Sequence, residues 1–483
     1  MKLTIEKFAK IKKAEIELDG ITVVTGYNDT GKSTIGKILY SMFNSLKSVD
    51  SSVNNKRRSD ISKICDEITE AVCGGESIIY QEGEDGNQDV IFVDDILSKE
   101  ILGFQGDLTI DEYKRIVNYV FSKLLTADEL NEKKMEIDNY IESSYSKISA
   151  IKNTPDEELY KVIVERYFSN IFYSQINNCY YPDNDARVSL NIKDKIIDIT
   201  FKNNKCSKID LPLKILHEAF LIDDPFVLDT GIYRRMGYTG NMIRDNLIRR
   251  IFFQRANLMD GIFDAVASKE SIKEINNILD KVVDGEIRSA KDGMQYISFG
   301  HEEPVSVMNL SAGIKGFVLI KTLLERGILK EKDVLILDEP EIHMHTQWQL
   351  VYAEIIVLIQ KYFDMTILVT THSSHFLQAI EYYSKKYKIE HNCNYYLSKS
   401  DGEGVIFQNV ADYSSRMLHR CFYFFPILHT HHSVGTGDFH GRLKSEEGIS
   451  SPFFLIFHTF QYITVGTYSF QNSQNFHRSL NIR

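Results

Sequence analysis

The sequence predicts an α/β fold in which a mostly helical insertion separates two lobes of one head. A short apolar strand at 21–25 runs into a Gly-rich loop and then into a helix. Far along the chain, apolar strands at 334–337 and 366–370 alternate with helices at 317–329 and 348–363. This alternation predicts a mainly parallel sheet, and an N-terminal hairpin makes the sheet of the whole head mixed.

Pattern and composition divide the chain into four expected parts. They are 1–45, the N-terminal lobe of the head; 46–290, the insertion; 291–415, the C-terminal lobe; and 416–483, an atypical tail.

The insertion carries three kinds of pattern. Helical spacing at 110–125 and 127–151 predicts two helices, and the second is expected to be an arm packed on a neighbour. Helical spacing occurs again at 243–283. Alternation at 186–201 predicts a small β element. The polar, charged segment 48–62 is expected to form a loop or mobile surface.

The bulk composition is typical of a soluble globular protein with a sizeable core. The chain has 483 residues, of which 43% are hydrophobic and 25% charged. No apolar run reaches the roughly 18 residues of a membrane span, so we expect a cytoplasmic protein without a membrane partner. The net charge of -11 restricts any nucleic-acid contact to a local basic patch. Six cysteines without a C-x-x-C pair predict neither a zinc site nor disulfides, and are expected to be small buried residues.

The Gly-rich loop matches the phosphate-binding pattern G-x-x-x-x-G-K-[ST] at every fixed position. Backbone N–H groups of such a loop point at phosphate oxygens, and the following helix adds a favourable dipole. We expect Lys32 on the β- and γ-phosphates of ATP and the Ser33 hydroxyl on Mg²⁺; the alternative is a chance Gly-rich turn. The expected nucleotide contacts are Gly26, Tyr27, Asn28, Asp29, Thr30, Gly31, Lys32, Ser33 and Thr34.

Two acidic residues and a histidine follow the later buried strands. Asp338 is expected to hold Mg²⁺ through water, and Glu339 to orient or deprotonate the attacking water. His372 ends the next strand at the same edge of the sheet, where it can bond the γ-phosphate or the water. The alternatives are an ordinary helix start for the acids and a surface role for the histidine.

A second anion site is expected at Leu310-Ser311-Ala312-Gly313, where Ser311 and free N–H groups precede a helix. The alternative is an ordinary serine cap with a glycine turn. One chain cannot readily place both sites on one phosphate. Two chains can, if each covers the nucleotide of the other.

Taken in order, these motifs resemble the ABC-type P-loop ATPase heads of the SMC, RecF and OLD group. The segment 341–345 with Trp348 and Gln349 looks like bacterial defence-associated "AAA family" ATP-binding proteins of the OLD-like branch. The resemblance covers about 1–45 and 295–412. It implies an ATPase that dimerises head to head on ATP, with Ser311 and Gly313 of one chain on the γ-phosphate of the other.

The chain departs from those relatives in several ways. Ile314 stands where many have Gln or Glu, which weakens the expected contact in trans, and Gln88 is a candidate for the Mg²⁺-sensing glutamine. The insertion has no long coiled coil with a zinc hook. Asp401, Asp412 and Asp438 lack the paired arrangement of a Toprim nuclease. Nuclease chemistry would therefore have to come from a partner.

The predicted function is an ATP- and Mg²⁺-dependent switch that forms a homodimer or higher oligomer. It is expected to control a separately encoded effector, a nuclease or toxin, in anti-phage defence. An alternative is a DNA-repair or chromosome-associated ATPase, because arginines and aromatic residues interleave at 233–255. The favoured interpretation of that segment is an amphipathic helix with Ile243, Leu247 and Ile251 facing the core and solvated arginines. The large insertion argues against an ABC transporter subunit.

The tail changes character after about Cys421, where histidines and phenylalanines cluster and charges thin. The group His429, His431 and His432 suggests a metal site, but no cysteine or carboxylate stands at ligand spacing. Relatives are expected to continue with an ordered helix after Tyr413. A disordered end, or one out of frame or replaced, would explain the change.

Overall fold

The computed structural model of the protein describes residues 1–73, 78–82, 88–123, 125–229, 240–253, 269–290, 293–298 and 303–410. The predicted tail with its histidine group lies outside these residues, as do Arg234, Arg235 and Arg255 of the Arg-rich segment.

Among the described residues, eleven strands form one mixed sheet in the order β8-β7-β6-β1-β2-β16-β15-β3-β14-β13-β9. The strands are β1 Lys2–Phe8, β2 Ile11–Glu17, β3 Ile21–Gly26, β6 Ala186–Ile192, β7 Lys195–Lys202, β8 Lys205–Asp210, β9 Ala219–Ile222, β13 Val334–Asp338, β14 Thr366–Thr371, β15 Cys393–Ser400 and β16 Val405–Asn409. The run β15-β3-β14-β13-β9 is parallel throughout, as expected for this part of the chain. The predicted fold class is confirmed.

Helices cover both faces of the parallel run. In β13, Leu335 and Leu337 belong to one apolar core and Val334 and Ile336 to another, because successive strand residues point to opposite faces. The helices are α1 Lys32–Leu46, α7 Asp156–Phe172, α8 Met242–Ile248, α10 Lys269–Leu279, α11 Ala312–Glu325, α12 Thr346–Phe363 and α13 Ser374–Lys386, with short turns η1 Pro225–Asp229, η2 Arg249–Phe253, η3 Val307–Asn309 and η4 Glu390–Asn392. A small sheet joins β10 Gly285–Ala290, β11 Gly293–Ser298 and β12 Val305–Ser306.

The strands predicted as a small β element are part of the head sheet. β6 pairs with β1 along its length, and β7 pairs with β6. β9, which lies outside the predicted range 186–201, also joins this sheet and pairs with β13. Alternation predicts a strand but carries no information on a partner far away in sequence, so this pairing was not foreseen. The proposed domain boundaries stay predictions.

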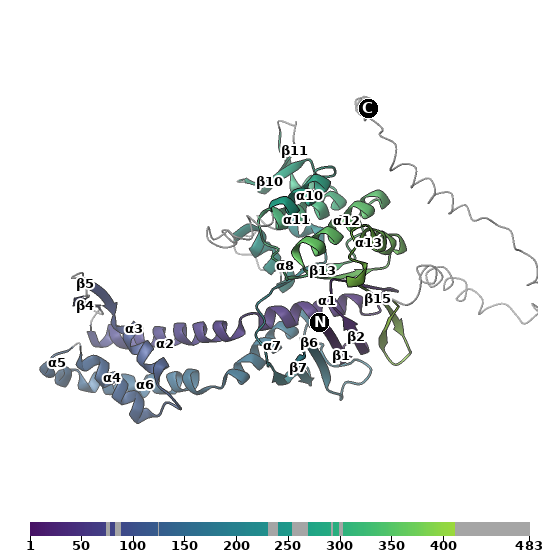
Figure 1. Ribbon diagram of the computed structural model, residues 1–483. Coiled ribbons are helices and arrows are strands. Elements are labelled where there is room, and N and C mark those ends of the chain that lie inside the picture. The colour runs from purple at the N-terminus through teal and green to yellow at the C-terminus, as the bar shows by residue number, and fades with distance from the viewer. Residues whose placement is uncertain are drawn as a thin grey trace, which may run out of the picture. The chain divides into compact units, whose positions relative to one another are not determined.

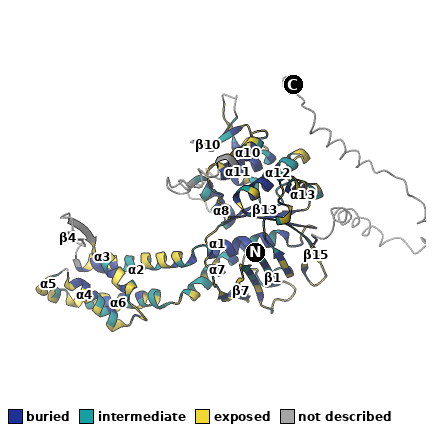
Figure 2. Cartoon of the chain, in the orientation of Figure 1, coloured by how far each residue is buried: buried dark blue, intermediate teal, exposed yellow. Residues whose placement is uncertain are grey.

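The segment 48–62, expected to be a loop, is helical, and that expectation was wrong. It belongs to α2 Val49–Cys73, which lies beside α3 Val93–Gly103 and α6 Lys134–Asn153 (Figure 1). Ile61, Cys65, Ile68 and Val72 are buried in the apolar core shared with these helices. Between the buried positions α2 is polar, and much of it is exposed (Figure 2). Sparse apolar residues on a polar helix give a weak sequence signal, and tertiary packing decides the outcome.

The helices α2 to α6 and the strands between α2 and α3 are called the arm from here on. Its remaining elements are β4 Ile78–Glu82, β5 Gln88–Phe92, α4 Ile110–Ser122 and α5 Ala127–Glu132. The helix predicted at 110–125 is present as α4, whereas the one predicted at 127–151 is divided into α5 and α6. The prediction that 127–151 packs on a neighbour is confirmed, since Ile137, Ile141 and Ile148 of α6 are buried in the core of the arm.

Candidate nucleotide-binding site

The predicted phosphate loop joins β3 to α1 and borders a cavity of about 530 Å³, within the usual range for ligand sites. The backbone of Asp29 and Gly31 is left-handed, with φ of 64° and 74°. Gly26 has φ of 144°, and a Cβ there would lie 2.1 Å from Ser398 Oγ. The bend of the loop therefore requires glycine at 26. The loop residues that line the cavity are Asn28, Asp29, Gly31, Lys32, Ser33 and Thr34.

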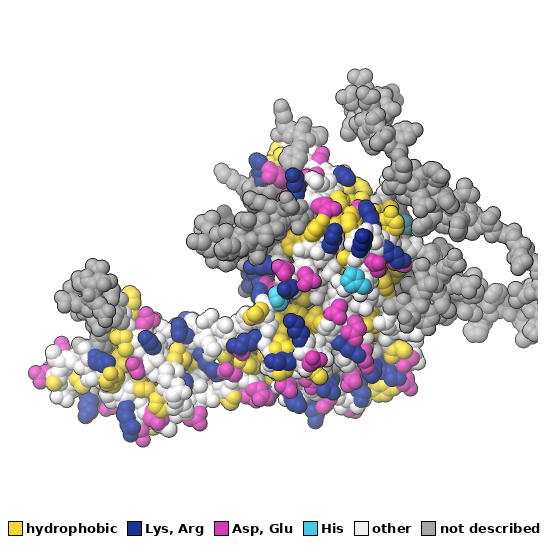
Figure 3. Space-filling model, viewed as in Figure 1, with side chains coloured by type: hydrophobic (Ala, Val, Ile, Leu, Met, Phe, Trp, Pro, Cys, Tyr) yellow, Lys and Arg dark blue, Asp and Glu magenta, His cyan; other side chains and the backbone are white. Residues whose placement is uncertain are grey.

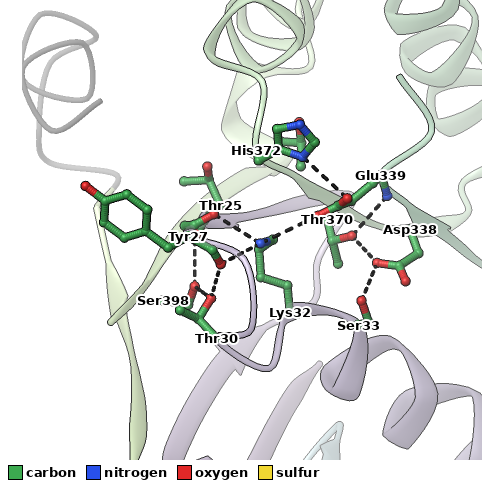
Figure 4. A network of polar contacts seen from close by, with 12 residues as sticks. Thr25, Tyr27, Thr30, Lys32, Ser33, Asp338, Glu339, Thr370, His372 and Ser398 are labelled. Carbon is green, nitrogen blue, oxygen red and sulfur yellow. Dashed lines mark hydrogen bonds and ion pairs between the residues drawn. The ribbon is translucent and has the colours of Figure 1, made fainter. Parts of the chain in front are cut away.

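Thr30 points away from the cavity and secures the loop. Its hydroxyl donates to the Tyr27 carbonyl at 2.7 Å and lies 2.6 Å from Ser398 Oγ on β15 (Figure 4). Ser398 in turn donates to the Thr25 carbonyl at 3.1 Å. Sequence reasoning missed Ser398, because no motif links residue 398 to the loop.

The Lys32 ammonium lies at the centre of the site and is nearly buried. Nζ donates to the carbonyls of Gly26 at 3.0 Å and Tyr27 at 2.8 Å (Figure 4). It also lies 3.6 Å from Glu339 Oε1. The Lys32 ammonium is thus held by two loop carbonyls and one carboxylate at the point where phosphate oxygens are expected to bind.

A hydroxyl and a carboxylate meet on the other side of Lys32. Ser33 donates to Asp338 Oδ1 at 3.0 Å, and Thr370 donates to the same oxygen. These hard oxygen donors suit Mg²⁺, which usually takes one or two protein oxygens and completes its shell with phosphates and water. Among the described residues no group of three or more His, Cys, Asp or Glu side chains converges as a metal cage.

Glu339 follows Asp338 but points another way, because its backbone is left-handed with φ of 50°. Its N–H donates to the carbonyl and hydroxyl oxygens of Thr370 at 3.0 and 3.1 Å, which stabilises this turn. The carboxylate lies between Lys32 and His372, whose Nδ1 is 3.4 Å from Glu339 Oε2 (Figure 4). The structure thus brings the predicted acid pair, lysine, serine and histidine together.

The second predicted anion site lies apart from this cavity. Ser311 caps α11, accepting from the Ile314 N–H at 3.4 Å, and is exposed. Neither Ser311 nor Gly313 lines the cavity of the same chain. α11 begins at Ala312 and not near Phe317 as predicted.

Gly313, for which a turn was the alternative interpretation, serves close packing, and so does Gly316. A Cβ on Gly313 would lie 3.0 Å from the His343 carbonyl and 3.1 Å from the Trp348 ring. A Cβ on Gly316 would lie 2.9 Å from Met344 Cε. The helix can therefore include both glycines, because they allow it to approach 343–348.

Asp223 is a site residue that sequence reasoning missed. β9 and β13 pair in register, so Asp223 follows Ile222 where Asp338 follows Leu337. Burial raises the pKa of its carboxyl, and Arg244 lies 3.5 Å away. Asp223 lines the main cavity and a second one of about 290 Å³ beside it. The signal was present: an apolar run followed by two acids and a proline occurs at both 221–225 and 336–340.

The far wall of the cavity comes from the segment after α7. Gln175, Asn177 and Cys179 line it together with Ala9 and Lys10 of the β1–β2 turn. Backbone bonds join the two segments, from Ala9 N–H to the Ile176 carbonyl at 2.8 Å and from Cys179 N–H to the Ala9 carbonyl at 3.0 Å. Cys179 is exposed, contrary to the expectation of burial for the cysteines.

Lys10 also pairs with Asp29 of the phosphate loop. Its Nζ lies 2.5 and 2.6 Å from the two carboxylate oxygens, and this hydrogen bonding raises the pKa of Lys10. A negative charge in the loop is thereby offset by a neighbouring cation.

The Mg²⁺-sensing role of Gln88 stays a prediction, and its place in the fold does not favour it. Gln88 belongs to β5, whose two-stranded sheet with β4 is separate from the sheet that carries the phosphate loop. A position before an apolar strand does not determine which sheet that strand joins.

The described part of the Arg-rich segment confirms one expectation and corrects another. Ile243, Leu247 and Ile251 are buried, as predicted. Arg244 pairs with Asp224 at 2.8 Å and Arg250 Nε donates to Glu218 at 3.1 Å, so these arginines are not simply solvated. On the face drawn in Figure 3, basic and acidic side chains of the described residues are interspersed.

No described helix is both long and apolar enough to cross a membrane.

A phosphate-binding loop after β3, beside an acid pair that ends β13 two positions along the same parallel sheet, defines a P-loop ATPase. The family described as "AAA ATPase domain" matches residues 1–377. The chain therefore belongs to this family and is an ATPase. No curated protein matches it.

Several solved structures are similar at low identity. An SMC head domain from Thermotoga maritima has 11% identity and a TM-score of 0.33, covering 85% of this chain and 98% of its own. An SmcHead bound to the C-winged helix domain of ScpA has 11% identity and a TM-score of 0.36, covering 84% and 97%. An Smc head with an extended coiled coil, bound to the C-terminal domain of ScpA derived from Pyrococcus furiosus, has 12% identity and a TM-score of 0.36, covering 87% and 98%.

Proposed function

We propose that this chain binds ATP with Mg²⁺ in the cavity of the phosphate loop and uses its hydrolysis as a conformational switch. The observation that carries this proposal is that Lys32, Ser33, Asp338 and Glu339, from two separate segments, line one cavity. His372, from a third segment, lies beside Glu339.

The triphosphate would lie on the loop and the N-terminus of α1. Phosphate oxygens would replace the Gly26 and Tyr27 carbonyls as partners of Lys32. Ser33 and Asp338 would hold Mg²⁺, which neutralises charge that develops on the phosphates. The nucleoside would extend toward Lys10, Gln175 and Cys179, the far wall of the same cavity.

Glu339 would orient or deprotonate the attacking water. Its half-buried carboxylate already lies between the Lys32 ammonium and the His372 ring, where the γ-phosphate and water must meet. His372 is nearly half exposed, so its ring is free to bond the γ-phosphate or the water.

Ser311 and Gly313 would act on the nucleotide of a second copy. Ser311 is exposed at the start of α11 and does not line its own cavity, which supports use in trans. A head-to-head homodimer is the arrangement in which such a pair of sites is used, and the resemblance to ABC-type heads favours it.

The output of the switch would be a separately encoded effector, in anti-phage defence. This step rests on the resemblance of 341–349 to OLD-like defence proteins. The ion pairs of Arg244 and Arg250 weigh against the DNA-binding alternative, because two of its candidate contacts are already engaged.

Turnover measurements test the proposal. Wild-type protein should release phosphate from ATP only with Mg²⁺, and Lys32→Ala should lose ATP binding. Lys99→Ala, an exposed lysine of α3, is the control. Equal ATP affinity in Lys32→Ala and wild type would exclude this cavity as the ATP site.

A further inference from the structure

The turn after the acid pair contains a buried carboxyl group that the proposed chemistry does not use. Glu341 is 3% exposed, and burial raises the pKa of its carboxyl. Its Oε2 is buried and accepts no hydrogen bond from any described residue. Burying a carboxyl with an unpartnered oxygen costs free energy, so packing alone does not account for it.

The other oxygen, Oε1, accepts a hydrogen bond from the hydroxyl of Thr371. Thr371 is fully buried at the end of β14, and its Oγ1 accepts the Ser373 N–H at 2.9 Å. The hydroxyl therefore bridges the two residues that flank His372. Ser373 is fixed in turn, because its own hydroxyl caps α13 by accepting the Phe376 N–H at 3.2 Å.

We propose that Glu341 is a positioning residue that, through Thr371, aims His372 at Glu339. The two carboxylates of one turn then have separate tasks: Glu339 contacts the His372 ring, and Glu341 holds the backbone that carries it. The inference rests on the proposed function, since it matters for catalysis only if His372 acts on the γ-phosphate or the water.

Three variants separate positioning from simple packing. Glu341→Leu removes the acceptor, Thr371→Val removes the hydroxyl at nearly constant shape, and Thr371→Ser restores it. Gln360→Leu is the matched control, because Gln360 is equally buried, has a buried Oε1 without a partner, and lies on α12 away from His372.

We expect Glu341→Leu and Thr371→Val each to lower kcat by about tenfold or more while the Kd for ATP changes by less than about twofold, since misplacing a reacting group affects the transition state most. The double variant should be no slower than either single one, because the two residues act as a unit. Thr371→Ser should recover most of kcat, and Gln360→Leu should change neither kcat nor the Kd for ATP.

A readout without nucleotide makes the test independent of the proposed function. In protein labelled with ¹³C-histidine, the His372 imidazole signal, assigned with His372→Asn, should shift in Glu341→Leu and in Thr371→Val and stay in place in Gln360→Leu. An unshifted signal in both variants, or additive losses of kcat, would overturn the positioning role. If the two variants shift the signal but the wild-type protein does not hydrolyse ATP, the proposed function is refuted and the positioning role of Glu341 stands. If Glu341→Leu fails to fold, Thr371→Val decides the matter alone.

Discussion

Replacing Glu339 by glutamine keeps the size of the side chain and removes its charge, so it separates two roles of one carboxylate. In the absence of nucleotide, Glu339 lies 3.6 Å from the Lys32 ammonium and 3.4 Å from His372 Nδ1. The charge therefore competes with phosphate for Lys32, and it is also the candidate general base.

The structure sets the size of the competition. At 3.6 Å and an effective dielectric constant of about 20, two unit charges attract by roughly 5 kcal/mol. Because the Glu339 side chain is 21% exposed, desolvation and screening reduce this to a net coupling of about 1 kcal/mol. Loss of the competitor should then tighten ATP binding by roughly fivefold.

Although Glu339→Gln should tighten ATP binding, it should slow ATP hydrolysis. Loss of a general base typically costs a factor of about 100 or more in rate, so Glu339→Gln should hold ATP with little hydrolysis. The ATP-bound variant should elute as a dimer if Ser311 acts in trans. The assays are calorimetric titration with ATP and Mg²⁺, phosphate release, and light scattering after size exclusion.

Glu100→Gln, an exposed change on α3, is the control for loss of one negative charge. Normal turnover in Glu339→Gln would refute the role of Glu339 as base. Weaker ATP binding would refute the competition for Lys32.

Three further outcomes are expected. Asp338→Asn should raise the Mg²⁺ concentration for half-maximal turnover by about tenfold, because it weakens a hard oxygen ligand; an unchanged Mg²⁺ titration contradicts this. Gly313→Val should lower the free energy of unfolding by about 1–3 kcal/mol in denaturant titrations, since the new side chain collides with the Trp348 ring. Gly103→Val is the control, because a Cβ at residue 103 has no atom within 4 Å. Burial and the nearby Asp66 raise the pKa of Asp94, so this carboxyl stabilises the fold below its unfolded pKa and loses that contribution as the pH rises. Asp66→Asn should therefore raise the melting temperature at neutral pH and have less effect in acid.

The parts of the site that belong to motifs could be predicted from the sequence. Gly26, Lys32 and Asp338 stand at fixed spacings from strands whose apolar runs are unambiguous. The strands β3, β14 and β13 then pair in parallel and bring the residues that follow them to one edge. Motif order and parallel pairing together are enough to place these side chains near each other.

The remaining wall could not be predicted, because no local rule connects it to the loop. Asn178 is an example. It is buried, donates to the Ile11 carbonyl at 3.2 Å, and accepts the N–H groups of Tyr180 and Tyr181. Nothing in residues 175–181 distinguishes this segment from an ordinary polar loop. Its role depends on the long-range contact with β1 and β2.

The same contact links the arm to the nucleotide cavity. The chain leaves the head after α1 and returns through α7, whose Phe168 and Phe172 pack on Phe8 with ring centroids 5.9 and 4.9 Å apart. Phe8 directly precedes Ala9 of the cavity wall, and α7 leads directly into Gln175. Because close-packed aromatic contacts transmit displacement, a shift of α7 has to move the wall of the cavity with it. The insertion is thus continuous with the site, and its first residues back in the head complete the cavity that the phosphate loop begins.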